Sequence, residues 1–407
     1  MSGARKEVMM PEGLWVKLIR EQARSGRCVL CGKCASECSS FRLLGNEIYS
    51  PRGRMALIEK FLNGNLKPGE KFYSSIMNCF LCGACEKSCP SRVRPRLAVL
   101  LVRNASFFEP HFQEHRQCLL SEMKGRYPAR LFEKMGLKVP VEKIPRAQMG
   151  VETCTIPSDS QHVFYFQSCM DAVFFRDSGR AAEVLVRKLG YEFCLPSVVI
   201  CCGALQLFTG MLDEARHIAM NNINALNASR NAPVICDCAT CAATLRLYPA
   251  LFPSGSKEEG LARKFAERVF VLADWLDKAH LHSGMFRSLN GLSVAFDEPC
   301  TLRHDVCATS SPRRILSCLK GINLVKFPQD DCSAGLPLLF DTCKENAAAM
   351  IQRNKVDFLK RNPVDVLVTE DSFSRMWWQT NLAREGQDKI RVMALSELLA
   401  QYLNYKT

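Results

Sequence analysis

Two cysteine runs in the chain share one spacing. The first is CVLCGKCASEC, beginning at Cys28, and the second is CFLCGACEKSCP, beginning at Cys79. Both follow the order Cys-x2-Cys-x2-Cys-x3-Cys, which is typical of bacterial ferredoxin-type 4Fe-4S sites. In that pattern three closely spaced cysteines bind one cluster, and the fourth ligates the neighbouring cluster. The spacing therefore predicts two 4Fe-4S clusters, the first held by Cys28, Cys31, Cys34 and Cys89 and the second by Cys79, Cys82, Cys85 and Cys38.

Zinc is the alternative occupant for these cysteines, because Cys-x2-Cys pairs also form zinc sites. Two complete four-cysteine runs favour iron-sulfur clusters. The second run ends in Pro90, as the ferredoxin pattern does, whereas the first has Ser39 at that position. This difference changes a turn residue and leaves the ligand set intact.

A further group of cysteines lies later in the chain, each where an expected strand turns into an expected helix. Turns of this kind meet at one edge of a parallel sheet, and helix N-termini there favour thiolates. The pattern therefore predicts one shared site. The residues alone leave open whether it holds a metal centre, zinc included, or buried thiols. The members are Cys169, Cys201, Cys202, Cys238 and Cys241.

The part of the chain that carries these cysteines is an internal repeat of one α/β unit. Each copy begins with an apolar strand ending in cysteine, HVFYFQSC and LSVAFDEPC. Strands that alternate with helices predict parallel sheets. Further matching segments are the inner strands APVICD and VDVLVTE, the closing strand-helix segments VFVLADWLDKAHL and RVMALSELLAQYL, and the helices DEARHIAMNNINALNASR and TCKENAAAMIQRNKVDFLKR.

The second copy of the unit lacks most of the cysteines. Cys300 matches Cys169, Cys332 stands in place of the adjacent pair, and VTEDSFSRM contains no cysteine. We therefore expect the second unit to hold no cluster and to serve as a structural, docking or substrate-facing lobe. Its acidic residues are expected to form a solvated rim and not a hard-metal site. They are Asp330, Asp331, Glu370 and Asp371.

The N-terminal cysteine runs flank a segment that predicts a helix, SPRGRMALIEKFLNGN. Ser50 is the expected N-cap, Pro51 the first helical residue and Gly64 the C-cap. We expect this helix to pack across both clusters. The fold class is thus α+β and α/β: a helical two-cluster ferredoxin-like module, a linker with short helices that include LFEKMGLKV, an intact α/β unit and a degenerate one. The expected boundaries are 1–108, 109–160, 161–285 and 286–407.

The other cysteines have no ligand spacing, and we expect them to be small buried apolar residues. His304, in CTLRH, is the histidine best placed for proton transfer or ligation, but without a paired base it favours a structural role. The cysteines concerned are Cys118, Cys154, Cys194, Cys236, Cys307, Cys318 and Cys343.

Composition limits the class of protein. The 407 residues include 22 cysteines, and MSGARKEVMMPEGLWVK has no apolar core of signal-peptide length. Clustered cysteines without an export signal favour metal ligands in the reducing cytoplasm over disulfides. The longest apolar run, Leu97 to Val102, is too short to span a membrane. The formal charge of +13 is explained by compensation of anionic clusters, so a nucleic-acid partner is not expected.

Nucleotide-binding motifs are missing from the sequence. We find no G-x-G-x-x-G turn and no Walker loop, so the chain is not expected to bind its own flavin or nicotinamide. Two-electron chemistry must then occur elsewhere. A row of one-electron clusters can accept electrons singly from a reduced flavin and deliver them to a distant acceptor.

Along essentially its full length the chain resembles the family of glycolate oxidase iron-sulfur subunits, with relatives in lactate utilisation, in anaerobic glycerol-3-phosphate dehydrogenase and in heterodisulfide reductase. Its five later cysteines resemble the CCG domain of heterodisulfide reductase. This resemblance implies that Cys169, Cys201, Cys202, Cys238 and Cys241 hold a third, non-cubane 4Fe-4S cluster. The segments on which the family resemblance rests are CVLCGKC, SPRGRMALIEKFLNGN, CFLCGACEKSCP, CCGALQLFTG and EPCTLRH.

The resemblance implies an electron-transfer subunit that works beside an FAD-containing 2-hydroxy-acid dehydrogenase and delivers electrons to a quinone or another redox carrier. A location in the cytoplasm, or peripherally on the cytoplasmic membrane face, would suit this role. The alternative is a catalytic subunit like heterodisulfide reductase, in which the five-cysteine site cleaves a disulfide. A zinc-dependent scaffold or nucleic-acid binder is a third, non-redox interpretation.

Overall fold

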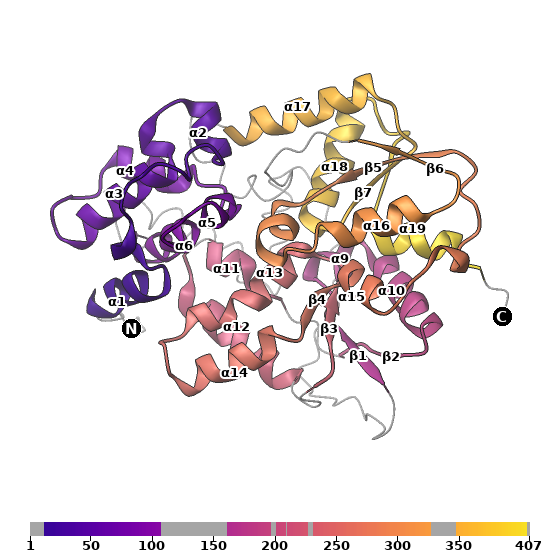
Figure 1. Ribbon diagram of the computed structural model, residues 1–407, viewed down its shortest axis with the longest axis horizontal. Helices are drawn as coiled ribbons and strands as arrows, with labels where there is room; N and C mark the ends of the chain where they lie inside the picture. The colour runs from indigo at the N-terminus through magenta and orange to yellow at the C-terminus, as the bar shows by residue number, and fades with distance from the viewer. Residues whose placement is uncertain are drawn as a thin grey trace, which may run out of the picture.

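Three bodies of structure pack together in the computed structural model, which describes residues 12–106, 161–196, 201–208, 210–226, 231–326 and 347–404. Helices of the N-terminal region lie beside two α/β units, each built on a four-stranded sheet (Figure 1). The expected fold class is therefore confirmed. The linker at 109–160, with LFEKMGLKV, lies outside the described residues, as do Cys332, Asp330 and Asp331.

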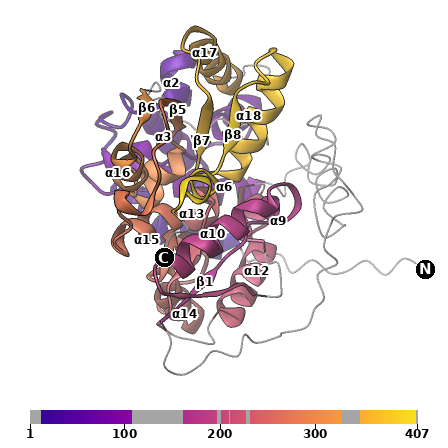
Figure 2. The same cartoon turned by 90° about the vertical axis from the view of Figure 1, so that its right-hand side faces the viewer.

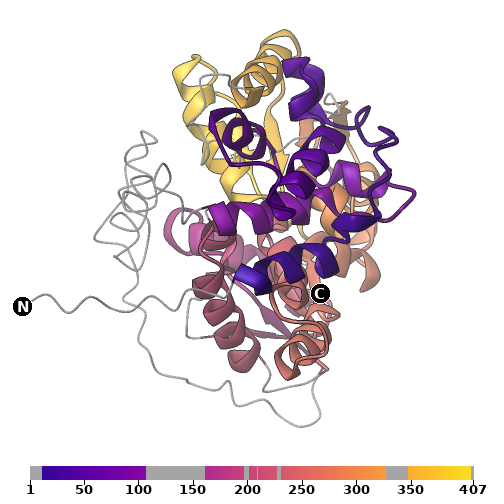
Figure 3. The same ribbon diagram turned by 90° about the vertical axis from the view of Figure 1, so that its left-hand side faces the viewer.

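The N-terminal region is helical, and Figure 3 shows its outer side. Helix α6 packs against both α1 and α3, and its residues Leu97 to Val102 are fully buried. The apolar run thus forms the core of this region. The helices are α1 (Glu12–Gln22), α2 (Ser39–Leu44), α3 (Pro51–Leu62), α4 (Glu70–Met77), α5 (Ala84–Lys87) and α6 (Pro95–Ser106), with 3-10 turns η1 (Ser25–Arg27) and η2 (Glu47–Tyr49).

Helix α3 begins as its sequence predicts. The Ser50 hydroxyl accepts a hydrogen bond from the Gly53 N–H at 2.8 Å, and Pro51 is the first helical residue. A side chain at Gly53 would overlap the Glu47 carbonyl oxygen, so the helix can lie this close to η2 only with glycine there. The expected C-cap was wrong by one residue: Asn63 caps the helix, and Gly64 follows it in the left-handed region.

The first α/β unit has a parallel sheet in the order β2-β1-β3-β4. Its strands are β1 (His162–Tyr165), β2 (Glu192–Cys194), β3 (Val234–Cys236) and β4 (Val269–Val271). Its helices are α9 (Cys169–Phe174), α10 (Arg176–Lys188), α11 (Ala204–Phe208), α12 (Leu212–Ala225), α13 (Ala239–Leu247), α14 (Lys257–Ala266) and α15 (Leu272–Lys278), with η4 (Tyr248–Leu251).

The second unit repeats that order as β6-β5-β7-β8, again parallel, which confirms the expected internal repeat. Its strands are β5 (Leu292–Asp297), β6 (Ile322–Val325), β7 (Val366–Thr369) and β8 (Arg391–Met393). Its helices are α16 (Ser310–Cys318), α17 (Ala347–Arg361), α18 (Ser372–Arg384) and α19 (Leu395–Tyr402), with the 3-10 turn η5 (Ser283–Met285) before β5 and the π-helical turn η6 (Leu302–Val306) after it.

The two units meet through α10 and α19, which lie side by side (Figure 2). Polar side chains cross this boundary. Arg375 of α18 donates to both carboxylate oxygens of Glu397 at 2.9 and 2.8 Å, and to the Ser178 hydroxyl of α10 at 2.9 Å. A bidentate, buried pair of this kind fixes the relative orientation of the elements that carry it.

A buried cation holds the second unit together internally. Lys355 of α17 donates to Asp297, at the end of β5, at 2.7 Å, and both side chains are 1% exposed. The Trp378 indole N–H of α18 donates to the other oxygen of the same carboxylate at 2.7 Å. The carboxylate thereby ties two helices to the central strand.

Among the described helices, none is long and apolar enough to cross a membrane.

Candidate iron-sulfur sites

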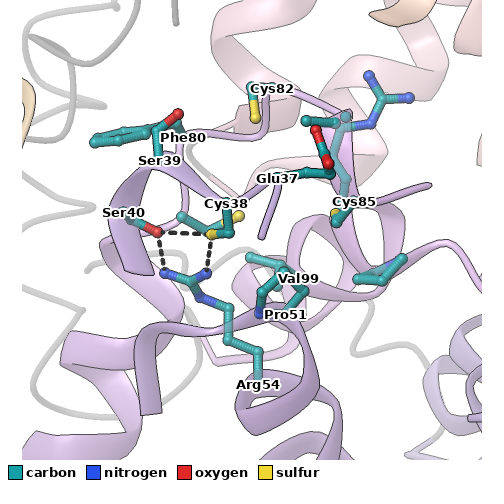
Figure 4. Close-up of a pocket in the computed structure, with 15 residues that line it drawn as sticks. Glu37, Cys38, Ser39, Ser40, Pro51, Arg54, Phe80, Cys82, Cys85 and Val99 are labelled. Atoms are coloured by element: carbon teal, nitrogen blue, oxygen red, sulfur yellow. Dashed lines mark hydrogen bonds between the residues drawn. The ribbon is translucent and has the colours of Figure 1, made fainter. Parts of the chain in front are cut away.

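The second cysteine run and the end of the first enclose one pocket, drawn in Figure 4. Its volume is about 390 Å³, part of it open to solvent. All four thiols predicted for the second cluster line it, including Cys38, which precedes α2. Cys38 and Ser40 both donate to the Tyr49 carbonyl of η2, at 3.7 and 3.4 Å, which holds the end of the first run beside the segment that leads into α3.

Arg54 of α3 points into the floor of this pocket (Figure 4). Its guanidinium donates to the Cys38 sulfur at 3.7 Å, to the Ser40 hydroxyl at 3.0 Å and to the Ser75 carbonyl at 2.8 Å. The side chain is 2% exposed. In the described part of the chain no carboxylate forms an ion pair with it. A buried, unneutralised cation beside four thiols fits an anionic iron-sulfur cluster.

The environment of these thiols supports the same occupant. Burial raises the pKa of Cys85 well above its usual value, and the nearby Glu86 carboxylate raises it further. Burial also raises the pKa of Cys79, against the opposing charges of Arg54 and Arg103. Thiols placed this way ionise readily only when metal binds them, because a metal deprotonates its thiol ligands.

The first run gathers its own set of thiols. Burial, together with the charges of Cys28, Cys89 and Cys31, raises the pKa of Cys34 to about 11. Cys89, from the second run, thus lies among the thiols of the first, and its sulfur accepts the Val93 N–H at 3.3 Å. The structure therefore brings together both predicted ligand sets, although their binding of iron stays a prediction.

The five later cysteines meet between the strands' carboxyl ends and the helices that follow. The thiols act on one another's pKa in a connected series: Cys201 on Cys169 and on Cys202, and Cys202 and Cys238 on Cys241. Cys169 and Cys202, with the Gly203 N–H that donates to Cys201 at 3.4 Å, lower the pKa of Cys201 well below its usual value. The structure thus brings these five thiols together, and their binding of one cluster stays a prediction.

Two polar residues that the sequence did not single out hold the Cys201–Cys202 turn. Asn222 of α12 donates to the Cys201 carbonyl at 2.9 Å and to the Tyr248 hydroxyl at 2.7 Å. Tyr248 in turn donates to the Cys202 carbonyl at 2.9 Å. Neither residue has a sequence signal, because each is recognisable only from the turn it contacts.

The acidic residues after β7 are buried, so the expected solvated rim was wrong for this pair. Glu370 is 2% exposed and Asp371 is 1% exposed. The Cys238 thiol donates to an Asp371 carboxylate oxygen at 3.5 Å, and the Ala239 N–H donates to the Glu370 carbonyl at 2.6 Å. The second unit therefore covers the five-thiol site of the first. Asp371 stands after β7 where Cys238 stands after β3, which is the signal that could have located it.

Replacing Asp371 with serine tests its part in this site. Serine keeps a helix N-cap for α18, where Asp371 now accepts the Ser374 N–H at 2.9 Å, but removes the carboxylate beside Cys238. We expect iron at the five-thiol site to be lost to a chelator about 10-fold to 100-fold more readily, the usual effect of removing a ligand's hydrogen-bond partner. Iron content after chelation measures this. Asp388→Ser on the surface is the control, and an unchanged iron loss would leave Asp371 only a helix cap.

The remaining cysteines divide between core and surface. Cys236 is fully buried, as expected, and Cys194 is half-buried. Cys307 and Cys318 are exposed, so the expectation of burial was wrong for these two. Cys118, Cys154 and Cys343 lie outside the described residues. His304 lies against Gly83 of the second run, and its structural role stays a prediction.

Single-ion sites are not found in the described part of the chain. No group of three or more histidine, cysteine, aspartate or glutamate side chains there has the placement for one metal ion.

Comparisons with known proteins agree with this donor chemistry. Residues 24–93 match the family model "4Fe-4S dicluster domain", and residues 163–246 match "Cysteine-rich domain". The "Probable glycolate oxidase iron-sulfur subunit" of Bacillus subtilis (strain 168) is 23% identical over 423 residues, covering 93% of this chain and 94% of the relative. The "Glycolate oxidase iron-sulfur subunit" of Escherichia coli (strain K12) is 24% identical, covering 89% and 91%.

A crystal structure of a hypothetical protein from Helicobacter pylori shares the fold, with a TM-score of 0.53 and 9% identity over 98% of this chain and 78% of that one. With the two domain matches and the long relatives, the resemblance expected from the sequence is confirmed. The chain thus has a 4Fe-4S dicluster domain followed by a cysteine-rich domain, and along most of its length it is similar to proteins named as glycolate oxidase iron-sulfur subunits.

Proposed function

We propose that this chain is the iron-sulfur electron-transfer subunit of a multi-subunit oxidoreductase. It passes electrons one at a time between an FAD-dependent 2-hydroxy-acid dehydrogenase, of the glycolate or lactate type, and a quinone or another redox carrier. The observation that carries the proposal is the gathering of thirteen cysteines into three separate thiol groups within one packed chain. Several one-electron centres without a nucleotide motif suit transport of electrons better than chemistry on a substrate.

Two 4Fe-4S clusters and a third, non-cubane cluster are the proposed cofactors. The first is held by Cys28, Cys31, Cys34 and Cys89, the second by Cys79, Cys82, Cys85 and Cys38, and the third by Cys169, Cys201, Cys202, Cys238 and Cys241. When bound, they supply reversible one-electron storage. The chain's own residues bind them and set their charge environment: Arg54 donates toward the second, and the Gly203 N–H donates toward the third.

The proposed domains follow the chain in order. Residues 1–108 form the module that holds the first two clusters, and residues 109–160 link it to the α/β units. Residues 161–285 form the unit that holds the third cluster, and residues 286–407 form the degenerate unit. The fold supports this division, since the two sheets have matching strand orders. The names of the relatives support a flavoprotein partner. The cysteine-rich composition supports a cytoplasmic location, with peripheral contact at the membrane when the acceptor is a quinone.

The decisive experiment begins with anaerobically purified full chain. We expect about twelve irons per chain and three EPR-distinguishable centres. When the chain is mixed with its co-purifying flavoprotein, glycolate or lactate should reduce the clusters. Neither substrate should reduce the clusters of this chain when the flavoprotein is left out. Zinc in place of iron would overturn the proposal. Disulfide reductase activity in the isolated chain, without any flavoprotein, would favour the catalytic, heterodisulfide reductase-like alternative.

A further inference from the structure

The two cysteine runs form loops with the same backbone but very different surroundings. Leu30 and Leu81 occupy equivalent positions and both lie in the left-handed region, with φ of 55° and 52°. Leu81 is 4% exposed, whereas Leu30 is 48% exposed. A leucine in this conformation is strained, and burial of its side chain helps to offset that strain. The second loop obtains this compensation within the chain, and the first does not.

The cover of the second loop comes from the second α/β unit. Residues of η6 lie against it: a side chain at Gly83 would contact Asp305 and His304. Lys87 donates to the Arg303 carbonyl at 2.6 Å, and Arg96 forms an ion pair with Asp305. A separate structural element thus docks on this loop and shields it from solvent.

The corresponding face of the first loop is apolar and open. Val29 is 71% exposed, and with Leu30 it makes up two of the four large hydrophobic side chains that are exposed among the described residues. Cys31, next to them, is also exposed. Adjacent exposed apolar side chains mark interaction surfaces more often than isolated ones do. Here they lie in the chain between Cys28 and Cys31, two predicted ligands of the first cluster.

Exposed basic side chains flank this apolar pair in the sequence. Arg24, Arg27 and Lys33 are all exposed, and Glu37 is the acidic residue of the same loop region that is exposed. Arg52 also lies over the loop, close to Gly32, although it is paired with Glu47 at 2.8 Å. An apolar centre with a positively charged rim is complementary to an acidic protein surface that has an apolar centre of its own.

We propose that this face, formed by Arg24, Arg27, Val29, Leu30 and Lys33, is the docking surface for an acidic redox protein that exchanges electrons with the first cluster. The inference rests on the proposed function and adds the place where electrons cross between chains. One electron crosses per encounter, so the donor centre is oxidised by one equivalent and the acceptor centre is reduced by one. The partner takes the position over the first loop that η6 takes over the second.

Stopped-flow reduction of the cluster-loaded full chain tests this, with a reduced plant-type ferredoxin as the acidic one-electron probe. Val29→Ser with Leu30→Asn removes the apolar centre, and asparagine tolerates the left-handed backbone. Arg27→Glu with Lys33→Glu reverses the rim charge. We expect each double variant to be reduced about 10-fold more slowly at low salt, and the charge variant to lose the fall in rate with rising salt.

Matched controls separate docking from damage. Leu195→Asn changes a side chain of 45% exposure elsewhere, and Lys188→Glu with Lys264→Glu changes net charge equally on α10 and α14; neither should slow the reaction. Photoreduced deazaflavin, a small reductant, should reduce all variants alike. Equal ferredoxin rates in the loop and control variants would overturn the docking surface alone. If the wild-type chain is a dimer and Val29→Ser with Leu30→Asn makes it monomeric, the surface binds a second copy of this chain and the docking proposal is overturned. If no reductant reduces the clusters of any variant, the proposed function is contradicted instead.

Discussion

Replacing Cys38 with alanine is expected to remove the second 4Fe-4S cluster, although Cys38 belongs to the first cysteine run. Its thiol lines the pocket formed by Cys79, Cys82 and Cys85, so that site would keep only three ligands. We expect the chain to lose up to about four irons, or to retain a three-iron form with a distinct EPR signal, while the first cluster remains. Iron analysis and EPR of the reduced and oxidised protein measure the outcome.

The reciprocal variant supplies the control for this exchange of ligands. Cys89→Ala should affect the first cluster, because Cys89 lies among Cys28, Cys31 and Cys34. Cys318→Ala, at an exposed cysteine outside the predicted ligand sets, should leave the iron content unchanged. Loss of the first cluster's signal in Cys38→Ala would contradict the assignment and show that each run binds its own cluster.

Replacing Arg54 with methionine is expected to lower both the stability of the protein and the potential of the second cluster. The guanidinium is a buried positive charge at this pocket, and it donates hydrogen bonds to Cys38, Ser40 and Ser75. Removing the guanidinium leaves the buried anionic cluster without this opposite charge, and the loss of one partner of a buried charge pair lowers the free energy of unfolding by about 3–5 kcal/mol. Without the cation, adding an electron to an anionic cluster becomes less favourable, so its potential falls. Redox titration followed by EPR, with thermal unfolding of the loaded protein, measures both effects.

Two further variants show whether the charge or the hydrogen bonds of Arg54 matter. Arg54→Lys keeps the charge but loses the planar fork, so we expect the potential to stay closer to that of the wild type while stability still falls. Arg52→Met removes a partly exposed arginine and should have a smaller effect on both quantities, because solvent screens its pair with Glu47. An unchanged potential in Arg54→Met would mean that this cation does not act on the cluster.

Features with a strong local pattern could be predicted from the sequence. The start of α3 follows from Ser50 and Pro51, whose side chains determine a helix N-terminus without help from tertiary structure. The matching order of the two sheets follows from the repeated strand and helix segments. The grouping of the thiols follows from their spacing, because the spacing decides which loops can close around one point.

Features that depend on packing between distant segments could not be predicted from the sequence. Asp371 was expected in solvent because acidic residues usually lie there, yet a neighbouring unit buries it against Cys238. Cys307 and Cys318 were expected in the core because free cysteines usually are, yet both are exposed. Sequence statistics describe a residue type on average, whereas burial depends on the element packed above it.

The degenerate unit lies against two of the three thiol groups, through η6 over the second cysteine run and through Asp371 beside Cys238. We expect it to shield the centres held there from oxygen. A chain shortened at residue 285 would expose both groups to air. Its clusters should decay faster during aerobic handling than those of the full chain. The second unit would then protect clusters although it lacks most of the cysteines of the first unit.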